Sequence, residues 1–240
     1  MSLDSPLRIS QSLLAATGTR MFVYHEDRIP SGSPALVVSN HRSFMDAPVL
    51  MAGVGQSIRF ACHHYMAQVP VLRDMVNQFG AFPLEAPAHR QQAFFQQATG
   101  LLQARQMVGL FPEGAQTMVR STQPGGMAEF HRGFAHLALR AKVQDLVVLP
   151  VAIASCEEII VPWVPVKLLS LFDPTEPAFQ QEGWHPMVIY KRVNVLIGRP
   201  FWITATQRDS YQGKKAKRVV DDLLGHTHTE IAELLHQGCY

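Results

Sequence analysis

Short apolar runs alternate along this chain with segments whose apolar residues recur at the helical period. The apolar runs, each typical of a buried strand, are 35–40 (ALVVSN), 57–63 (SIRFACH), 80–84, 107–111, 145–153 and the alternation that ends at Ile197. Helical periodicity marks 44–55, 72–79, 88–105, the region around Phe134 and a tail at 214–237. Strands separated by such helices predict an α/β domain with a central, mostly parallel, mixed sheet flanked by helices.

The bulk properties narrow this picture. The 240 residues show no linker, so we expect a single domain over 1–240. A net charge of only +2 argues against nucleic acid as a partner. Three scattered cysteines are no disulfide framework and indicate a reducing compartment. Neither a signal peptide nor a membrane-spanning run is evident, so we expect the chain on the cytoplasmic side.

The first candidate site follows the strand at 35–40, where the chain reads SNHRSFMD. Ser43 and Asp46 have the spacing of a capping box, in which Ser43 caps the next helix. That interpretation leaves His41 unexplained. A turn between His41 and Asp46 would let the carboxylate accept a hydrogen bond from one ring nitrogen and leave the other nitrogen as a general base. Both interpretations stay open at this point.

A second polar turn follows the strand at 107–111, in MVGLFPEG. Glu113 should open on the same sheet edge as His41, because the carboxyl ends of parallel strands meet there. The sequence has no G-x-S-x-G nucleophile motif. Cys62 stands beside His63 and His64, but neighbouring strand residues point to opposite faces, which disfavours a thiolate pair or metal site. The base would therefore activate a substrate hydroxyl directly.

Together these motifs resemble the glycerolipid acyltransferase family typified by 1-acyl-sn-glycerol-3-phosphate acyltransferase. Asn40, His41 and Asp46 match its N-H-x-x-x-x-D block, and FGAFPL at 79–84 resembles its second block. Its F-P-E-G block is matched by Phe111, Pro112, Glu113 and Gly114, and its proline-containing strand by VLPVAI at 148–153. The resemblance covers about residues 20–235 and implies a glycerol-3-phosphate-acyltransferase-like fold.

The resemblance implies that a fatty acyl group moves from a thioester, on coenzyme A or acyl carrier protein, to a lysolipid hydroxyl. The implied product is phosphatidic acid, made from 1-acyl-glycerol-3-phosphate. His41 would be the catalytic base and Asp46 would orient it. The turn from Phe111 to Gly114 would bind the acceptor's glycerol part, with Glu113 as the main polar contact. No metal, other cofactor or covalent acyl-enzyme is implied.

The sequence departs from the family where an arginine usually binds the acceptor's phosphate. Glu85 and Ala86 follow the second block, and Ala115, Gln116 and Thr117 stand where the family commonly has threonine or serine, then arginine and serine. Three arginines near these blocks are substitute phosphate ligands, because guanidinium binds phosphate bidentately: Arg90, Arg120 and Arg132. His64 is a weaker candidate. Each has the alternative of being an ordinary surface charge.

A lysolipid substrate implies docking on the cytoplasmic face of a membrane as a peripheral protein. Residues 1–20 include an amphipathic stretch that either lies in the interface or packs on the domain. The prolines of 159–172 argue against a regular helix or central strand there, and Trp163 suits a headgroup anchor or a groove-lining loop. The basic run 214–218 either attracts anionic lipid or begins the last helix.

Three alternatives remain. The acceptor is another lysolipid or a lipid alcohol without phosphate, as the missing arginine suggests. The protein is a thioesterase, with water replacing the acceptor. From another class, it is a non-catalytic lipid-binding protein on the same fold.

Overall fold

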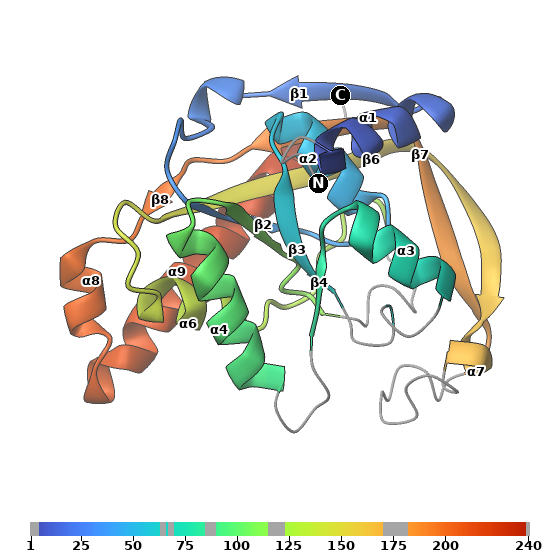
Figure 1. Cartoon of the computed structure of the whole chain (residues 1–240). Coiled ribbons are helices and arrows are strands. Elements are labelled where there is room, and N and C mark those ends of the chain that lie inside the picture. The colour runs from blue at the N-terminus through green and yellow to red at the C-terminus, as the bar shows by residue number, and fades with distance from the viewer. Residues whose placement is uncertain are drawn as a thin grey trace.

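The computed structural model describes residues 5–62, 66, 70–84, 90–114, 123–169 and 182–238. Helices and strands alternate through most of these residues, as Figure 1 shows. The elements in chain order are α1 (Ser5–Ala16), β1 (Arg20–Tyr24), a 3-10 turn (Glu26–Arg28), β2 (Ala35–Ser39), α2 (Asp46–Val54), β3 (Ile58–Cys62), α3 (Pro70–Gln78), β4 (Phe82–Pro83), α4 (Arg90–Gln103), β5 (Met107–Leu110), α6 (Gly133–Arg140), β6 (Val147–Pro165), α7 (Val166–Leu169), β7 (Trp184–Ile197), β8 (Phe201–Trp202), α8 (Ala205–Ser210) and α9 (Gly213–Gln237).

The strands form one mixed sheet in the order β1-β7-β6-β2-β5-β3-β4, with β8 beside β6. The pairs β1–β7, β2–β6, β2–β5, β3–β5 and β3–β4 are parallel. Strand β6 runs antiparallel to β7 and to β8. The sequence-based prediction of an α/β fold with a mostly parallel, mixed sheet is therefore confirmed.

Helices cover both faces of the sheet (Figure 1). Leu36 and Val38 of β2 pack into a core with α4, α6 and α9, whereas Ala35 and Val37 pack into a second core with α1 and α2. All five residues of β2 are buried, as expected for a central parallel strand with both faces covered. The apolar run of β2 is uninterrupted because its alternate residues pack into two different cores. This is the pattern expected of a strand in the middle of the sheet.

Strands β6 and β7 extend past the sheet as a two-stranded arm, which Figure 1 shows reaching away from the body with α7 at its tip. Pairing of β6 with β2 ends at Val151, and from Glu157 to Pro165 the pairing is with β7 alone. Pro162 faces Pro186 across the arm. Proline fits an edge position because it lacks an N–H. The expectation of no central strand at 159–172 agrees with this arm. The expectation of no helix there is wrong at 166–169, where the four-residue helix α7 begins directly after the last proline of the arm, and 170–172 lie outside the described residues.

Helix α1 packs on the domain, which is one of the two arrangements that the sequence left open for residues 1–20. Leu14 is buried in the core that α1 shares with α2. Ser10 is also buried, and its hydroxyl donates to the carbonyl of Pro6. Arg8 and Gln11 face solvent, so the outer side of α1 is polar.

Within the residues that the structure describes, no helix combines the length and the apolar character needed to cross a membrane. Helix α9, which corresponds to the tail expected at 214–237, is the longest at 25 residues. Its buried residues, among them Val220, Leu223 and Ile231, pack against the sheet. The basic run at 214–218 forms its exposed first turn, where Lys214 and Lys215 face solvent.

Candidate active site

His41 lies two residues beyond the end of β2, in the turn that leads into α2. Its Nδ1 is 2.7 Å from Oδ2 of Asp46, the first residue of α2. Because a carboxylate accepts, Nδ1 carries the ring proton and donates it. The contact that the sequence predicted between these two side chains therefore forms. Nε2 has no hydrogen-bond partner among the described residues, and the ring borders a large groove.

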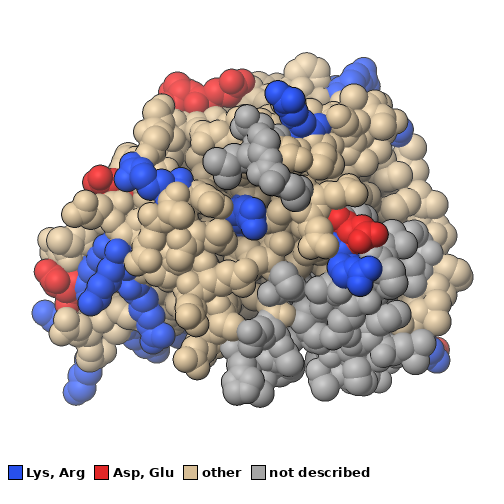
Figure 2. Space-filling view, viewed as in Figure 1, with Lys and Arg blue, Asp and Glu red and all other residues tan. Residues whose placement is uncertain are grey.

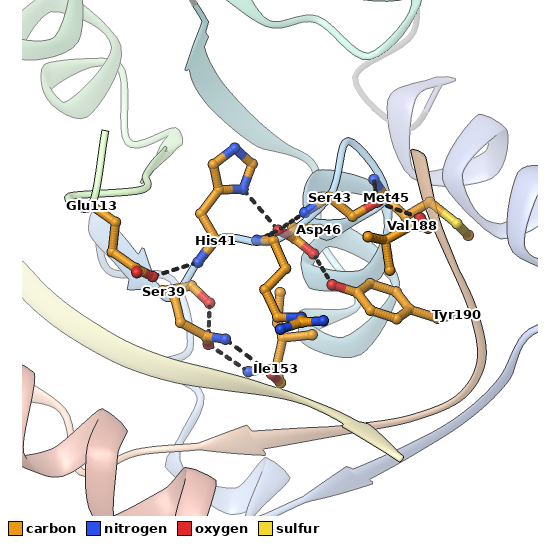
Figure 3. A network of polar contacts seen from close by, with 11 residues as sticks. Ser39, His41, Ser43, Met45, Asp46, Glu113, Ile153, Val188 and Tyr190 are labelled. Carbon is orange, nitrogen blue, oxygen red and sulfur yellow. Dashed lines mark hydrogen bonds and ion pairs between the residues drawn. The ribbon is translucent and has the colours of Figure 1, made fainter. Parts of the chain in front are cut away.

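The Asp46 carboxylate gathers three further donors (Figure 3). Oδ2 accepts from the backbone N–H of Arg42 at 2.6 Å and of Ser43 at 2.9 Å. Oδ1 accepts from the hydroxyl of Tyr190 at 2.6 Å. Asp46 is fully buried, so these donors satisfy a carboxylate that water does not reach. The carboxylate is thus fixed in place, and it fixes the tautomer and orientation of the His41 ring.

Tyr190 was not foreseen from the sequence. It lies on β7, 144 residues after Asp46, and its side chain is completely buried. Burial, followed by the neighbouring Asp46 charge, raises the pKa of Tyr190 well above 10, so the hydroxyl keeps its proton and can donate it. The alternation of VIYKRVNV marks a strand, but no local pattern indicates which strand or loop it meets.

Ser43 corrects the capping interpretation. The N-cap of α2 is Met45, not Ser43. The Ser43 hydroxyl instead donates to the carbonyl of Val188 at 2.6 Å and accepts from the Met45 N–H at 3.1 Å. Of the two capping-box bonds, only the one from the Ser43 N–H to Asp46 forms. The serine therefore ties the turn that carries His41 to β7.

Asn40 ties the same turn to β6. Its side-chain amide donates to the carbonyl of Ile153 at 3.0 Å and accepts from the Ile153 N–H at 2.8 Å. The Asn40 side chain thus makes the two hydrogen bonds to Ile153 that a backbone partner would make if β2 continued beside β6. The N-H-x-x-x-x-D block and the proline-containing strand at 148–153 are therefore in direct contact.

Glu113 lies beside His41, as expected for the ends of the neighbouring parallel strands β2 and β5. Its two oxygens accept from the backbone N–H of His41 at 2.7 Å and of Ala128 at 2.6 Å. The side chain is only 3% exposed. Burial raises the pKa of Glu113, although both amide bonds act in the opposite direction. In the structure Glu113 therefore connects the backbone at His41 to the backbone at Ala128. Its role toward the acceptor stays a prediction.

The rest of the F-P-E-G turn shapes the surroundings of the histidine. The Phe111 ring stacks on His41 with centroids 4.1 Å apart and planes 13° from parallel. The Pro112 carbonyl accepts from the His131 N–H at 2.8 Å. Gly114 has φ +75°, and a Cβ there would come within 3.2 Å of the His131 ring, so a larger residue would be strained. The turn therefore fixes one wall of the site.

Arg42 forms a buried ion pair with Glu158 on the arm. Their closest atoms, Nη2 and Oε1, are 2.6 Å apart, and the Arg42 side chain is 3% exposed. The Ser155 hydroxyl donates to the other Glu158 oxygen at 2.5 Å. The pair brings together two positions 116 residues apart in sequence. It attaches the turn carrying His41 to the arm by a third contact, after those of Ser43 and Tyr190.

A groove of about 580 Å³ opens at His41. Its volume is typical of a ligand site. Most of its described lining is apolar, from β3, α3, the two residues that flank β4, α4 and the F-P-E-G turn, and includes Phe60, Val76, Leu84, Phe94 and Phe95. Among those lining residues the only basic side chains are His41 and His131. The groove therefore suits a hydrocarbon chain with its reacting end at the imidazole.

The three arginines proposed for phosphate are placed differently. Arg132 lies just before α6 with its side chain exposed, and it pairs with Asp221 of α9 at 3.1 Å rather than lining the groove. Arg90 is the first residue of α4, and nothing is described of its side chain. Arg120 falls outside the described residues, as do His64 and the positions 85–86 and 115–117. The phosphate ligand thus stays a prediction.

Cys62, at the end of β3, lines the groove as a half-buried free thiol. Burial raises the pKa of this thiol to about 12. It therefore stays protonated near neutral pH, and a thiol is a much weaker nucleophile than a thiolate. This leaves the histidine as the described group in the groove best placed to handle a proton during chemistry.

Comparisons with known proteins agree with this geometry. A family model described as Acyltransferase matches residues 20–154. Over 119 residues the chain is 28% identical to the chloroplastic 1-acyl-sn-glycerol-3-phosphate acyltransferase LPAT1 of Arabidopsis thaliana. That match covers 49% of this chain, and the chain spans about a third (32%) of that relative.

A solved structure also has a similar fold. It is the 1-acyl-sn-glycerophosphate (LPA) acyltransferase PlsC from Thermotoga maritima, with a TM-score of 0.63 and 15% sequence identity. The similarity covers 98% of this chain and 78% of that one. At this identity the likeness concerns the fold, and it extends over nearly the whole sheet and its helices.

Proposed function

This chain belongs to the acyltransferase family, and we propose that it moves a fatty acyl group from a thioester donor to the hydroxyl of 1-acyl-glycerol-3-phosphate, giving phosphatidic acid. The donor is acyl-coenzyme A or acyl-acyl carrier protein. One observation carries the proposal: an imidazole held by a buried carboxylate borders a long apolar groove. The names of the relative and of the similar structure support the same acceptor.

The chemistry follows from the two ring nitrogens of His41. Nε2 takes the proton of the acceptor hydroxyl while that oxygen attacks the thioester carbonyl carbon. Asp46, bonded to Nδ1, stabilises the imidazolium that forms. The tetrahedral intermediate then loses its carbon–sulfur bond, and the imidazolium returns the proton to the leaving thiolate. An ester and a free thiol result, and the histidine is ready for another cycle.

A second candidate is acylation of a lipid that carries no phosphate. It is favoured by the absence of any lysine or arginine among the described residues that line the groove. In this version a monoacylglycerol or lipid alcohol supplies the hydroxyl, and the same histidine and aspartate act on it.

The decisive experiment offers the purified protein a panel of acceptors and identifies the products by mass spectrometry. The panel contains lysophosphatidic acid, other lysophospholipids, monoacylglycerol and a long-chain alcohol, each with acyl-coenzyme A and with acyl carrier protein donors. We expect phosphatidic acid, and in a His41→Ala variant a loss of roughly 10²–10⁴-fold or more in kcat. Acylation of only the phosphate-free acceptors would establish the second candidate. Thiol release without any acceptor would identify a thioesterase. No reaction with any combination of donor and acceptor would leave only the non-catalytic lipid-binding protein.

We further propose that the protein works as a peripheral protein on the cytoplasmic face of a membrane, with the β6–β7 arm as its contact. Five of the large exposed apolar residues lie on this arm: Ile159, Ile160, Val161, Leu168 and Trp184, the last 58% exposed. Exposed apolar groups gathered in one place are typical of interaction sites. The base of the arm holds the Tyr190 and Glu158 contacts, so docking there brings His41 near the lipid.

Flotation with anionic phospholipid vesicles tests this contact. A triple variant, Ile160→Ser, Leu168→Ser and Trp184→Ser, should float at least several-fold less than the wild type. Trp202→Ser is the matched control, because Trp202 is 48% exposed on β8, away from the arm. Wild-type protein that stays in the soluble fraction, or equal flotation of the triple variant, would exclude the arm.

A further inference from the structure

A second cavity lies at the opposite edge of the sheet from His41. Its volume is about 440 Å³, and it opens where β2, β3 and β5 begin. Ser33, Ser57 and Gln106 line it, each one or two residues before one of these strands. Helix α3 contributes Asn77, so much of the described lining is polar. This cavity has a different character from the apolar groove.

Two arginines line this cavity, and none of its described lining residues is acidic. Arg59, on β3, is half-buried, and its Nε is buried without a hydrogen-bond partner. The structure gives the Arg59 side chain no ion pair with any described residue. Arg105, just after α4, donates from Nη2 to the carbonyl of Gly32. Its remaining N–H groups have no acceptor among the described residues. The Arg59 guanidinium is partly removed from water, which is unfavourable without a counter-charge, so an anion would stabilise it. Arg105 is exposed and offers a second guanidinium to the same anion.

The local backbone explains why Arg59 reaches the cavity. Strand β4 pairs with β3 only at Ala61 and Cys62, so the edge of β3 at Arg59 is not covered by a strand. The guanidinium passes beside Gly80, where a Cβ would come within 3.1 Å of Nη1. Gly80 also has φ +63°, which favours glycine. The turn between α3 and β4 thus leaves room for this arginine.

We propose that this cavity binds the phosphate group of a small anionic molecule. Arginine pairs present the planar donor arrays that suit phosphate oxygens. The cavity is large enough for more than one phosphate, since ligand sites start at about 300 Å³. Because Arg59 has no ion-pair partner among the described residues, the phosphate takes the position of a counter-charge.

This site is separate from the one that handles the acceptor. Ser33 and His41 lie on either side of the five-residue strand β2, which spans roughly 16 Å. The phosphate of a glycerol phosphate whose hydroxyl is at His41 cannot reach that far. Two sources of phosphate remain: the nucleotide part of coenzyme A, whose pantetheine arm is long, and a free phosphorylated molecule. Ala81 lines both the cavity and the groove, so the two sites are neighbours.

Titration calorimetry with inorganic pyrophosphate tests the site, and it measures binding rather than acyl transfer. We expect wild-type protein to bind and the Arg59→Gln/Arg105→Gln double variant to bind at least tenfold more weakly. Lys217→Gln/Arg218→Gln on α9 is the control of equal charge, because both positions are exposed and distant from the cavity in the fold. Gln56→Glu, at an exposed lining position, should also weaken binding by adding a negative charge, and it tests the site if the double variant does not fold.

The His41→Ala variant should bind pyrophosphate as the wild type does, which separates this site from the proposed acyl transfer. If coenzyme A displaces pyrophosphate, the bound phosphate belongs to the acyl donor. If coenzyme A does not displace it, the ligand is a free phosphorylated molecule. No heat with wild-type protein overturns the proposal. Equal affinity in the wild type, the double variant and Gln56→Glu also overturns it.

Discussion

The hydroxyl of Tyr190 donates to Oδ1 of Asp46 across 2.6 Å, in a part of the molecule closed to solvent. The other oxygen of the same carboxylate accepts from the ring of His41. A tyrosine on an antiparallel strand therefore helps to position His41, the proposed base, through the aspartate, without lining the groove itself.

Replacing Tyr190 with phenylalanine should keep the packing and remove this donor. A hydrogen bond to a charged group contributes about 1.5–3 kcal/mol, so we expect kcat to fall by up to about 10- to 150-fold. KM for both substrates should stay nearly unchanged, because the ring touches neither. Steady-state kinetics measure the two parameters separately. Tyr24→Phe, on the exposed face of β1, is the control. A change in KM with kcat intact would assign Tyr190 a different role.

Asp46→Asn should lower kcat by about 10²- to 10⁴-fold, because an amide donates where the carboxylate accepted and thereby favours the wrong tautomer of His41. Circular dichroism and the melting temperature of the variant should show a folded protein, because asparagine has nearly the same shape as aspartate. The matched substitution Asp222→Asn on α9, whose side chain is 72% exposed, should leave kcat unchanged. A folded Asp46→Asn enzyme that keeps more than a tenth of wild-type kcat would remove the aspartate from the mechanism.

Filling the groove should change the preferred chain length. Ala61 lines the groove from β3, and Ala61→Leu adds three carbons there. We expect kcat/KM for long-chain donors to fall roughly tenfold relative to short-chain donors, the scale of a lost apolar contact. Competition between donors of different length, with products read by mass spectrometry, measures the ratio. Ala205→Leu on α8 is the exposed control. An unchanged ratio would place the acyl chain elsewhere.

Glu113 should give stability a specific pH dependence. Its pKa is raised above 4.5 in the folded protein, so the folded state holds this proton more tightly than the unfolded state does. Its contribution to the free energy of unfolding should therefore fall as the pH rises from about 4.5 through the raised pKa. Glu113→Gln removes that titration, so the wild type minus variant difference should decrease over this window.

Urea unfolding of both proteins at several pH values measures the difference, which a flat or rising profile would contradict.

Independently, Glu113→Ala should raise KM for the acceptor more than KM for the donor, if the turn binds the glycerol part as the resemblance implies.

The sequence was sufficient for the parts of the site that depend on neighbouring strands. The apolar run of β2 predicted a buried strand, and parallel pairing with β5 brought His41 and Glu113 to one edge. The contact between His41 and Asp46 could be predicted because they are only five positions apart and a turn suffices. Local sequence patterns, together with the rule that parallel strands end at the same edge of a sheet, were enough to predict these contacts.

The contacts with the arm could not be predicted. Tyr190, Glu158 and Val188 meet the turn only because β6 and β7 run antiparallel past the sheet edge, and this depends on long-range pairing. The prolines at 162 and 165 obscured the strand, since proline is unfavourable in a sheet except at an edge. Arg42 likewise gives no sign in sequence that it is buried in an ion pair.

Four separate donors converge on one carboxylate, from the ring of His41, two consecutive backbone N–H groups and Tyr190. The loop bearing His41, the proposed base, consequently loses its conformational entropy once, when the chain folds. Little of that entropy remains to be lost in each turnover, and the dipoles around the reacting hydroxyl need not reorient as charge develops. Substrate binding energy is thereby left for aligning the hydroxyl and the thioester with each other.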